Sequence, residues 1–412
     1  MREDWQISSL EEVVKFIDYR GKTPQKTEYG MHLITAKNVK MGYLQNKPME
    51  FVDPKIYDEW MTRGIPKKGD VLFTTEAPLG NVAQLDTDEK VIFAQRIIVM
   101  QPKREVLDST FLKYMLLSNL MQKKIHEKGT GATVQGIKSQ LLKKVPISFP
   151  RSLSEQKRIV AILDEAFEGI DRAIANTEKN LVNARELFES YLNAIFTQKG
   201  DGWVDAAIED RIKFIDYRGR TPNKTEGGMR LITAKNVKMG FLQLEPQEFV
   251  NPDIYDNWMT RGIPQKGDVL FTTEAPLGNV AQLDTDEKVV FAQRVIIMQP
   301  DEKFINKTFL KFLLLSNIIQ QRIQDKGTGA TAQGIKASLL KKIPISFPSD
   351  LLIQQSIVLK LETIEADTKR LETIYRQKIA ALNELKQSIL QKAFTGELTA
   401  DTPKAAKEAI AA

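Results

Sequence analysis

The sequence contains no cysteine and only two histidines among its 412 residues. Without cysteine the chain has no disulfide, no cysteine-ligated zinc and no thiol nucleophile, which fits the reducing cytoplasm where we expect the protein to reside. No apolar run reaches the 18 or so residues that span a bilayer, and the opening residues MREDWQISSL do not resemble a signal peptide. We therefore expect neither a secreted nor a membrane-spanning nor a thiol-dependent protein.

Positive charge is in slight excess. The chain has 59 lysines and arginines against 53 aspartates and glutamates, a net charge of +6 and a pI near 9.0. This balance suits a polyanionic partner such as nucleic acid without requiring one.

The sequence contains an internal repeat of one long unit. KFIDYRGKTP begins at Lys15 and KFIDYRGRTP at Lys213, an offset of 198 residues that recurs without a gap from Trp5 and Trp203 onward. The repeat predicts a globule at 1–151, a long helix at 152–198, a second globule at 199–349, a second long helix at 350–398 and a flexible tail at 399–412.

The two long helices show apolar residues at alternating steps of three and four, which is typical of a coiled-coil seam. Pro150 and a Ser152–Glu155 capping box mark the first start, and Asp350 caps the second. The predicted seam residues are Ile159, Leu163, Ala166, Ile170, Ala173, Thr177, Leu181, Ala184, Phe188, Tyr191 and Ile195 in the first helix, and Ile357, Leu361, Ile364, Thr368, Leu371, Tyr375, Ile379, Leu382, Ile389 and Ala393 in the second.

The order of the segments predicts how the helices pair. The second helix leaves the second globule, and the first helix is its only comparable partner, so we expect it to fold back antiparallel. Two like globules joined in this way are related by an approximate two-fold axis, as are the strands of duplex DNA. Symmetric DNA-binding proteins contact half-sites about 34 Å or more apart.

Each globule is predicted to be α+β. Strands are expected at 33–39, 70–75, 81–85 and 91–102, because these apolar runs are bounded by glycine and proline. A single amphipathic helix is expected at 110–129, ending at Gly129. Gln95 and Arg96 interrupt an otherwise apolar strand, and we interpret them as bracing the fold.

Motifs for catalysis are weak. His32 and His126 are replaced by Arg230 and Gln324 in the second copy, so neither predicts a catalytic histidine. GATVQGIKS, from Gly131, lacks the adjacent Gly-Lys-Ser/Thr of a phosphate loop. Aspartates and glutamates at 70, 76, 86, 88 and 89 are compatible with a Mg²⁺ site, but acidic residues in turns are more commonly solvated. We predict no metal site and no catalytic residue.

Polar loops carry the residue types that bind DNA. Lysine and arginine neutralise phosphates, whereas Asn, Gln, Arg and Glu have the geometry to contact base edges. For any single residue, an ordinary surface turn explains the pattern equally well. The candidates are Arg20, Lys22, Thr23, Lys26, Lys37, Asn38, Lys40, Thr74, Thr75, Glu76, Thr130, Thr133, Gln135 and Lys138 in the first copy, and Arg218, Arg220, Thr221, Lys224, Lys235, Asn236, Lys238, Thr272, Thr273, Glu274, Thr328, Thr331, Gln333 and Lys336 in the second.

Several runs resemble the specificity subunits of type I restriction–modification systems. They are KKVPISFPRSLSEQKRIVAILDEAFEGID with its repeat KKIPISFPSDLLIQQSIVLKLETIEAD, GDVLFTTEAPLGNVA, the Ala94-Gln95-Arg96 strand and the GTGAT loop. The resemblance covers almost the whole chain. In the second copy Ile353 replaces Glu155, so the Glu-Gln pair of the join is not repeated.

The resemblance implies a non-catalytic subunit with two target recognition domains, each of which reads one half of a bipartite DNA site. The helices set the spacing and dock two methyltransferase subunits, which methylate adenines with S-adenosylmethionine, and restriction/translocase subunits join them. S-adenosylmethionine, ATP and Mg²⁺ are thus expected only in partner subunits, and no membrane is involved.

Two other classes stay open on the sequence. A rod-like architectural protein outside any restriction complex would bind nucleic acid without sequence preference and with a steep salt dependence. A nuclease using the acidic residues would cleave DNA by itself when Mg²⁺ is present.

Overall fold

The computed structural model describes residues 4–19, 23–94, 96–131, 135–218, 221–292, 294–329 and 333–399. The chain forms two compact units, which we call unit 1 (Met1–Thr177 with Gln377–Ala412) and unit 2 (Glu178–Arg376). Each unit contains one globule and a part of both long helices. The chain therefore divides within its helices, and not at their ends.

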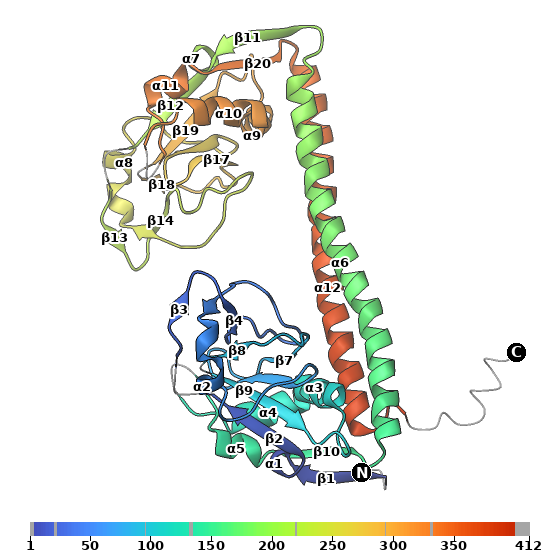
Figure 1. Ribbon diagram of the computed structural model, residues 1–412. Helices are drawn as coiled ribbons and strands as arrows, with labels where there is room; N and C mark the ends of the chain where they lie inside the picture. Colours follow the sequence, from blue (N-terminus) through green and yellow to red (C-terminus); the bar gives the residue numbers. More distant parts are fainter. Residues whose placement is uncertain are drawn as a thin grey trace, which may run out of the picture. The chain divides into compact units, whose positions relative to one another are not determined.

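The globule of unit 1 is built around a four-stranded antiparallel sheet in the order β2-β9-β6-β7 (Figure 1). A second sheet has the order β3-β5-β4-β8, in which β4 and β8 are parallel, and β1 pairs with β10. The elements are β1 (Trp5–Ser9), α1 (Leu10–Val13), β2 (Val14–Asp18), β3 (Lys26–Thr27), β4 (Met31–Ile34), β5 (Phe51–Val52), η1 (Pro54–Ile56), α2 (Tyr57–Trp60), β6 (Val71–Thr74), β7 (Val82–Gln84), β8 (Ile92–Phe93), β9 (Ile97–Pro102), α3 (Ser109–Leu117), α4 (Asn119–Glu127), α5 (Ser139–Lys143) and β10 (Pro146–Pro150).

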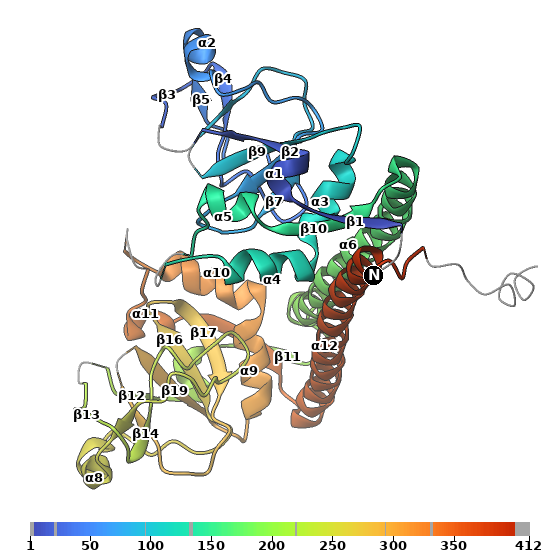
Figure 2. The ribbon, with the colours of Figure 1, turned by 90° about the horizontal axis from the view of Figure 1, so that it is seen from below.

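The central sheet separates two hydrophobic cores. Successive side chains of a strand point to opposite faces, so Val71 and Phe73 of β6 enter one core while Leu72 enters the other. This explains why β6 is an unbroken apolar run without polar alternation. The first core also contains α3, which lies between the sheet and the long helices (Figures 1 and 2).

The globule of unit 2 repeats this topology, with sheets in the orders β12-β19-β16-β17 and β13-β15-β14-β18 and the pair β11-β20. The predicted α+β fold and the internal repeat are confirmed. Its elements are β11 (Trp203–Ala207), α7 (Ile208–Arg211), β12 (Ile212–Asp216), β13 (Lys224–Thr225), β14 (Met229–Ile232), β15 (Phe249–Val250), η2 (Pro252–Ile254), α8 (Tyr255–Trp258), β16 (Val269–Thr273), β17 (Leu277–Gln282), β18 (Val290–Phe291), β19 (Val295–Pro300), α9 (Lys307–Leu315), α10 (Asn317–Lys326), α11 (Ala337–Lys341) and β20 (Pro344–Pro348).

The long helices are α6 (Leu153–Thr197) and α12 (Leu351–Thr395), each of 45 residues and so about 68 Å long. They pair antiparallel within each unit, as predicted. In unit 1 Lys386 Nζ lies 2.7 Å from Asp171 Oδ1, and in unit 2 Arg185 Nε lies 2.8 Å from Glu372 Oε1. From the first ion pair to the second, the position on α6 moves fourteen residues forward, from 171 to 185. The paired position on α12 moves fourteen residues back, from 386 to 372, as it must when the helices are antiparallel.

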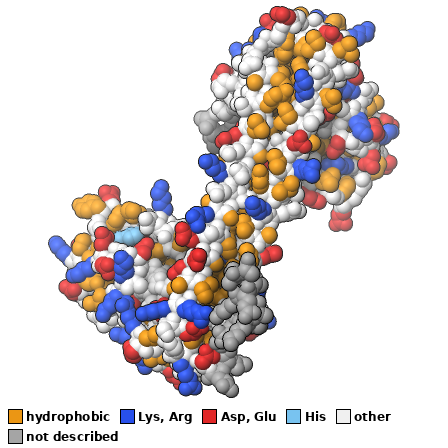
Figure 3. All heavy atoms as spheres, turned by 90° about the vertical axis from the view of Figure 1, so that its right-hand side faces the viewer, with side chains coloured by type: hydrophobic (Ala, Val, Ile, Leu, Met, Phe, Trp, Pro, Cys, Tyr) orange, Lys and Arg blue, Asp and Glu red, His pale blue; other side chains and the backbone are white. Residues whose placement is uncertain are grey.

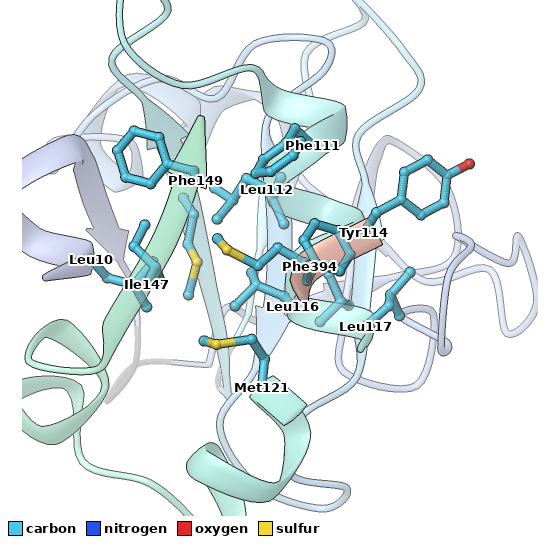
Figure 4. Packing of buried hydrophobic residues seen from close by; sticks show 14 of the residues in the cluster. Leu10, Phe111, Leu112, Tyr114, Leu116, Leu117, Met121, Ile147, Phe149 and Phe394 are labelled. Carbon is cyan, nitrogen blue, oxygen red and sulfur yellow. The ribbon is translucent and has the colours of Figure 1, made fainter. Parts of the chain in front are cut away.

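The predicted seam describes one of two apolar faces. Phe167 and Phe196 are buried although they lie outside it, because they face the globules. Phe167 packs edge-on against Tyr114 and Phe196 against Phe309, at centroid distances of 5.3 and 5.4 Å. Conversely, the predicted seam residue Leu371 is 38% exposed. From α12, Phe394 enters the cluster formed by Phe111 and Leu112 (Figure 4).

Two predicted elements are each split in two. The helix expected at 110–129 breaks at Ser118, whose extended backbone ends α3 and whose hydroxyl accepts from the backbone N–H of Met121 at the start of α4. The strand expected at 91–102 is divided into β8, which ends at Phe93, and β9, which begins at Ile97; Arg96, between them, has a left-handed φ of 74°. A side chain that caps, or a reversed φ, overrides the hydrophobic pattern at these positions.

The two helix starts differ from each other. At α12 the carboxylate of Asp350 accepts from the N–H of Leu352 at 2.8 Å, which confirms the predicted cap. At α6 the hydroxyl of Ser152 lies 2.7 Å from that of Ser154, and Glu155 pairs with Arg158. The predicted Ser152–Glu155 capping box is therefore wrong.

A buried glutamine joins each long helix to its globule. Gln156 accepts from the N–H of Asp108 at 2.8 Å and donates to the carbonyls of Val106 and Pro150 at 2.9 and 2.8 Å. Gln354 makes the same three hydrogen bonds in unit 2. Both side chains are fully buried, which explains why glutamine stands in both copies whereas Glu155 is replaced by Ile353.

We expect Gln156→Leu to lower the free energy of unfolding of unit 1 by about 3 kcal/mol, because three buried backbone groups lose their partner. Thermal unfolding measures the effect. The matched control is Glu155→Ile, which copies the residue of the second repeat and should change little. Equal melting temperatures for Gln156→Leu and Glu155→Ile would contradict the role assigned to the glutamine.

Candidate nucleic-acid interface

Six of the candidate DNA-binding residues are buried, so the structure removes them from the interface. They are Asn38, Thr74, Thr75, Asn236, Thr272 and Thr273. Asn38 shows the reason: its Oδ1 accepts from the backbone N–H of Thr35, and its Nδ2 donates to the carbonyls of Gln45 and Pro48. Such an amide fixes the loop that it belongs to and has no group free for a base.

Thr74 is used in the same way. Its hydroxyl donates to the carbonyl of Pro78 at 2.6 Å and accepts from the N–H of Asn81 at 2.9 Å. The sequence does not distinguish such residues from surface readers, because Asn and Thr favour loops in both roles.

The guanidinium of Arg218 is bound by Asp216, the last residue of the preceding strand, β12. Its Nε and one terminal nitrogen donate to the two carboxylate oxygens of Asp216 at 2.8 and 2.6 Å. Burial by itself raises the pKa of Asp216, but the hydrogen bonds from Arg218 outweigh it and hold that pKa below its ordinary value. The charge of Arg218 is therefore already paired with a carboxylate of the same globule. Its counterpart Arg20 lies outside the described residues, as do Lys22, Thr133, Arg220 and Thr331.

Most of the other candidates are exposed in both copies. These residues are Thr23, Lys26, Lys37, Gln135 and Lys138, with Thr221, Lys224, Lys235, Gln333 and Lys336 in the second copy. Thr130 and Thr328 are also exposed, whereas Lys40 and Lys238 are partly buried. The residue types predicted to contact phosphate thus lie at the surface.

The structure brings several of these residues together. A hollow of about 180 Å³ in the second globule is lined by Thr221, Lys224, Lys235, Glu248 and Arg294. Glu248 lies 2.8 Å from Lys224 Nζ and 3.3 Å from Lys235 Nζ. The hydrogen bond from Lys224, helped by Lys235, holds the pKa of Glu248 below its ordinary value.

The first globule has the same set of charges. Glu50 lies 2.9 Å from Lys26 Nζ and 4.0 Å from Lys37 Nζ. In each globule, one carboxylate therefore lies near two lysines from different segments of the chain.

On the face drawn in Figure 3, lysine and arginine side chains are interspersed with aspartate and glutamate.

Gly136 and Ile137, which follow the GTGAT run, reach the end of β6. Gly136 forms backbone bridges with Glu76 and Thr130, and the N–H of Ile137 donates to the carbonyl of Thr75 at 2.9 Å. A Cβ at Gly136 would lie 3.2 Å from the Cβ of Glu76, so this approach favours glycine. The second copy repeats the contacts with Gly334 and Glu274.

The sequence interpretation assigned Gln95 and Arg96 to bracing the fold. Gln95 lies outside the described residues, whereas Arg96 and its counterpart Arg294 are surface residues. The interpretation holds for the backbone, because the carbonyl of Arg96 accepts from the N–H of Thr75 at 2.8 Å. The side chain is about half exposed, and its Nε lies 3.2 Å from Glu76 Oε1. The corresponding distance from Arg294 to Glu274 is 3.0 Å. A charged residue interrupting an apolar strand was the signal that pointed to this position.

The acidic residues do not form a metal site in the described part of the chain, where no group of three or more potential ligands comes together. Asp70 is buried and accepts from the backbone N–H of Lys67 and from the side chain of Gln101. Within the described residues, no helix is long and apolar enough to cross a membrane.

The fold and this surface define a class: a duplicated binding protein that presents two similar cation-bearing globules on long paired helices. The comparisons with known proteins identify the family. The model of the type I restriction modification DNA specificity domain matches twice, at residues 2–184 and 201–382. The chain therefore belongs to this family and is a non-catalytic type I specificity subunit, as the resemblance implied.

Relatives and solved structures agree with this assignment. The type I restriction enzyme MjaVIII specificity subunit of Methanocaldococcus jannaschii is 21% identical, over 96% of this chain and 93% of its own length. The EcoBI specificity subunit of Escherichia coli is 23% identical over 76% and 70%. A structure described as the basis of complex assembly and conformational transition of the type I R-M system matches with a TM-score of 0.77 at 18% identity, covering 97% of this chain and 99% of its own. The HsdS subunit from Thermoanaerobacter tengcongensis matches with a TM-score of 0.59 at 19% identity, over 97% and 98%.

The buried candidates lead to a prediction. Asn236→Ala should lower the free energy of unfolding of unit 2 by about 2–3 kcal/mol, because it leaves buried backbone groups without partners. The neighbouring exposed Lys235→Ala is the control and should leave the melting temperature nearly unchanged. If Asn236→Ala unfolds at the wild-type temperature, the structural role of the asparagine is wrong.

Proposed function

We propose that each globule reads one half of a bipartite DNA sequence, while the two helices fix the distance between the halves. The observation that carries this proposal is the repetition of one surface at a constant offset. Each globule has the same strand order, the same carboxylate holding two lysines, and the same arginine–glutamate pair. Two copies of one reader suit a target with two like halves.

The exposed cations have a clear task in this proposal. Lys26 and Lys37, with Lys224 and Lys235, neutralise phosphates and set the register of each globule on the duplex. Their carboxylate partners, Glu50 and Glu248, position the amino groups before DNA arrives. Gln135 and Gln333 add exposed amides of the kind that contacts adenine.

The helices offer the surface for partner subunits. Specificity subunits act with methyltransferase and restriction subunits, and we assign two methyltransferase subunits to the two similar halves of this chain. The chemistry belongs to those partners: S-adenosylmethionine for adenine methylation, and ATP with Mg²⁺ for translocation and cleavage. The methyltransferase extrudes its target base at a cost in stacking energy. The assembly works on cellular DNA, in the cytoplasm.

The similarity of the globules also predicts the form of the site. Two like readers related by a two-fold axis contact like half-sites on opposite strands, which makes the target an interrupted inverted repeat. The halves differ where the copies differ: the 82% exposed Tyr29 stands against Gly227, and His32 against Arg230. These positions are the ones expected to make the half-sites unequal.

Mapping methylated adenines in cells with and without the gene tests the proposal. We expect one class of methylated site to vanish with the gene, and its consensus to be an interrupted inverted repeat. A gene carrying a stop codon early in the second globule is the control for effects of the locus itself. Unchanged methylation, or two unrelated half-sites, would refute the proposed reading.

The spacing role leads to a separate prediction. Removing seven residues from each long helix, at positions 198 residues apart, shortens each by about 10 Å, which equals roughly three base pairs of DNA. The preferred gap should shorten by about that amount, and binding should weaken because the half-sites also rotate about the DNA axis. Selection from DNA libraries with randomised gaps measures the change. A preferred gap that stays at its wild-type length would exclude the helices as the spacer.

A further inference from the structure

We infer that Arg96 and Arg294 each read a guanine, one in each half-site, and that Glu76 and Glu274 hold the two guanidinium groups in place. This inference rests on the proposed function and names the residues that determine its specificity. The first observation that supports it is the location of backbone strain in the described chain.

Four described residues other than glycine have a positive φ: Ala77, Arg96, Ala275 and Arg294. All four lie at the arginine–glutamate pairs, because Ala77 follows Glu76 and Ala275 follows Glu274. A left-handed backbone at a residue with a Cβ is unfavourable and persists where surrounding contacts impose it. Strain gathered at one place in each globule points to a functional position.

The backbone on both sides of the pair is fixed. The carbonyl of Arg96 accepts from the N–H of Thr75, and Glu76 is bridged to Gly136. The second copy has the same arrangement, with the N–H of Thr273 donating to Arg294 and Glu274 bridged to Gly334. Each arginine therefore projects from a rigid base, as a side chain that must meet one base edge requires.

Stability does not explain the pair. The side chains of Arg96 and Glu76 are 47% and 48% exposed, and those of Arg294 and Glu274 are 49% and 48% exposed. Ion pairs between groups as exposed as these contribute little to folding. The strained backbone thus supports a side-chain arrangement that contributes little to the stability of the folded protein.

The chemistry of the exposed group fits guanine. In the second globule Glu274 accepts from Nε of Arg294 at 3.0 Å, a bond that leaves the two terminal nitrogens for another acceptor. Paired donors of a guanidinium match O6 and N7 of guanine in the major groove, the commonest specific contact to a base. Lysine lacks this planar fork, so the neighbouring lysines suit phosphates better.

The surroundings place the arginine where DNA would lie. Arg294 lines the same hollow as Thr221, Lys224 and Lys235. Two phosphate-binding cations beside one base-reading arginine make a compact contact with one half-site. Because the pair recurs in both globules, each half-site should contain one such guanine.

The experiment uses the full chain assembled with its methyltransferase subunits, the cognate duplex, and duplexes in which each guanine is replaced in turn. For wild type we expect one guanine in each half-site whose replacement weakens binding about 10- to 100-fold. Arg96→Ala should abolish that discrimination in one half-site, and Arg294→Ala in the other. Arg96→Lys keeps the charge but loses the fork, so it should also lose discrimination while retaining most affinity.

Lys26→Ala is the matched control. It should weaken binding to all duplexes alike and reduce the salt dependence, without relaxing any position. Glu76→Ala tests the positioning role and should relax the same guanine as Arg96→Ala, by a smaller factor. Thermal unfolding of every variant distinguishes a loss of folding stability from a loss of base recognition.

The outcomes are distinguishable. If wild type binds all the guanine-replaced duplexes as well as the cognate one, neither arginine reads a guanine and the inference is wrong; if it also binds a duplex of unrelated sequence equally well, the proposed function fails. If wild type discriminates but Arg96→Ala retains every preference, or weakens all duplexes uniformly, the arginine is not the reader and the proposed function stands. If Glu76→Ala relaxes a different base from Arg96→Ala, the glutamate reads DNA itself and the pairing inference is wrong.

Discussion

The structure depends on how two 45-residue helices bury their apolar faces. A helix this long cannot be covered by the globule from which it leaves, so it requires a second helix alongside. The chain meets this requirement by pairing α6 with α12 antiparallel inside each unit. As a consequence, each compact unit combines segments that are some 200 residues apart in sequence. Neither globule with its following helix is a complete unit, which ties the two halves of the duplication together.

The two copies share the buried glutamine that joins helix and globule, but they differ where the globule packs on the adjoining helix segment. In unit 1, Tyr114 packs on Phe167 and donates to Asp164, and burial together with that hydrogen bond raises the pKa of Tyr114. In unit 2 the positions of Tyr114 and Phe167 are held by Phe312 and Glu365, and Glu365 pairs with Lys311 at 3.4 Å. The hollow-lining lysines and the arginine–glutamate pairs are the same in both. This contrast fits two globules that have the same function but pack on different segments of the helices.

Much of this architecture could be predicted from the sequence, because its signals are long and repeated. The offset of 198 residues, the two helices and their antiparallel pairing depend on many residues at once. The breaks at Ser118 and before Arg96 depend on a single cap and a single reversed φ, which periodicity does not encode. The seam pattern does not reveal the second apolar face of the helices, because Phe167 and Phe196 lie outside the seam and face a globule instead of a helix.

The candidate site was predicted by residue type and only in part by position. Exposed lysines and buried asparagines occur in similar loops, and burial decides which of them can meet DNA. Asn38 and Asn236 are internal, whereas Arg96, interpreted as bracing the fold, and its counterpart Arg294 present half-exposed side chains. The sequence contains the residues of this surface, but the convergence of separate chain segments on one hollow follows only from the fold.

The claim that the two globules perform the same task on opposite strands can be tested by making them identical. Replacing the second globule with the sequence of the first, between the same helix ends, leaves both the joint glutamines and the helix lengths in place. DNA selected by the reconstituted complex should then contain two identical inverted half-sites, separated by the wild-type gap. Selection of a site with unequal halves, or of one half-site alone, would contradict the account.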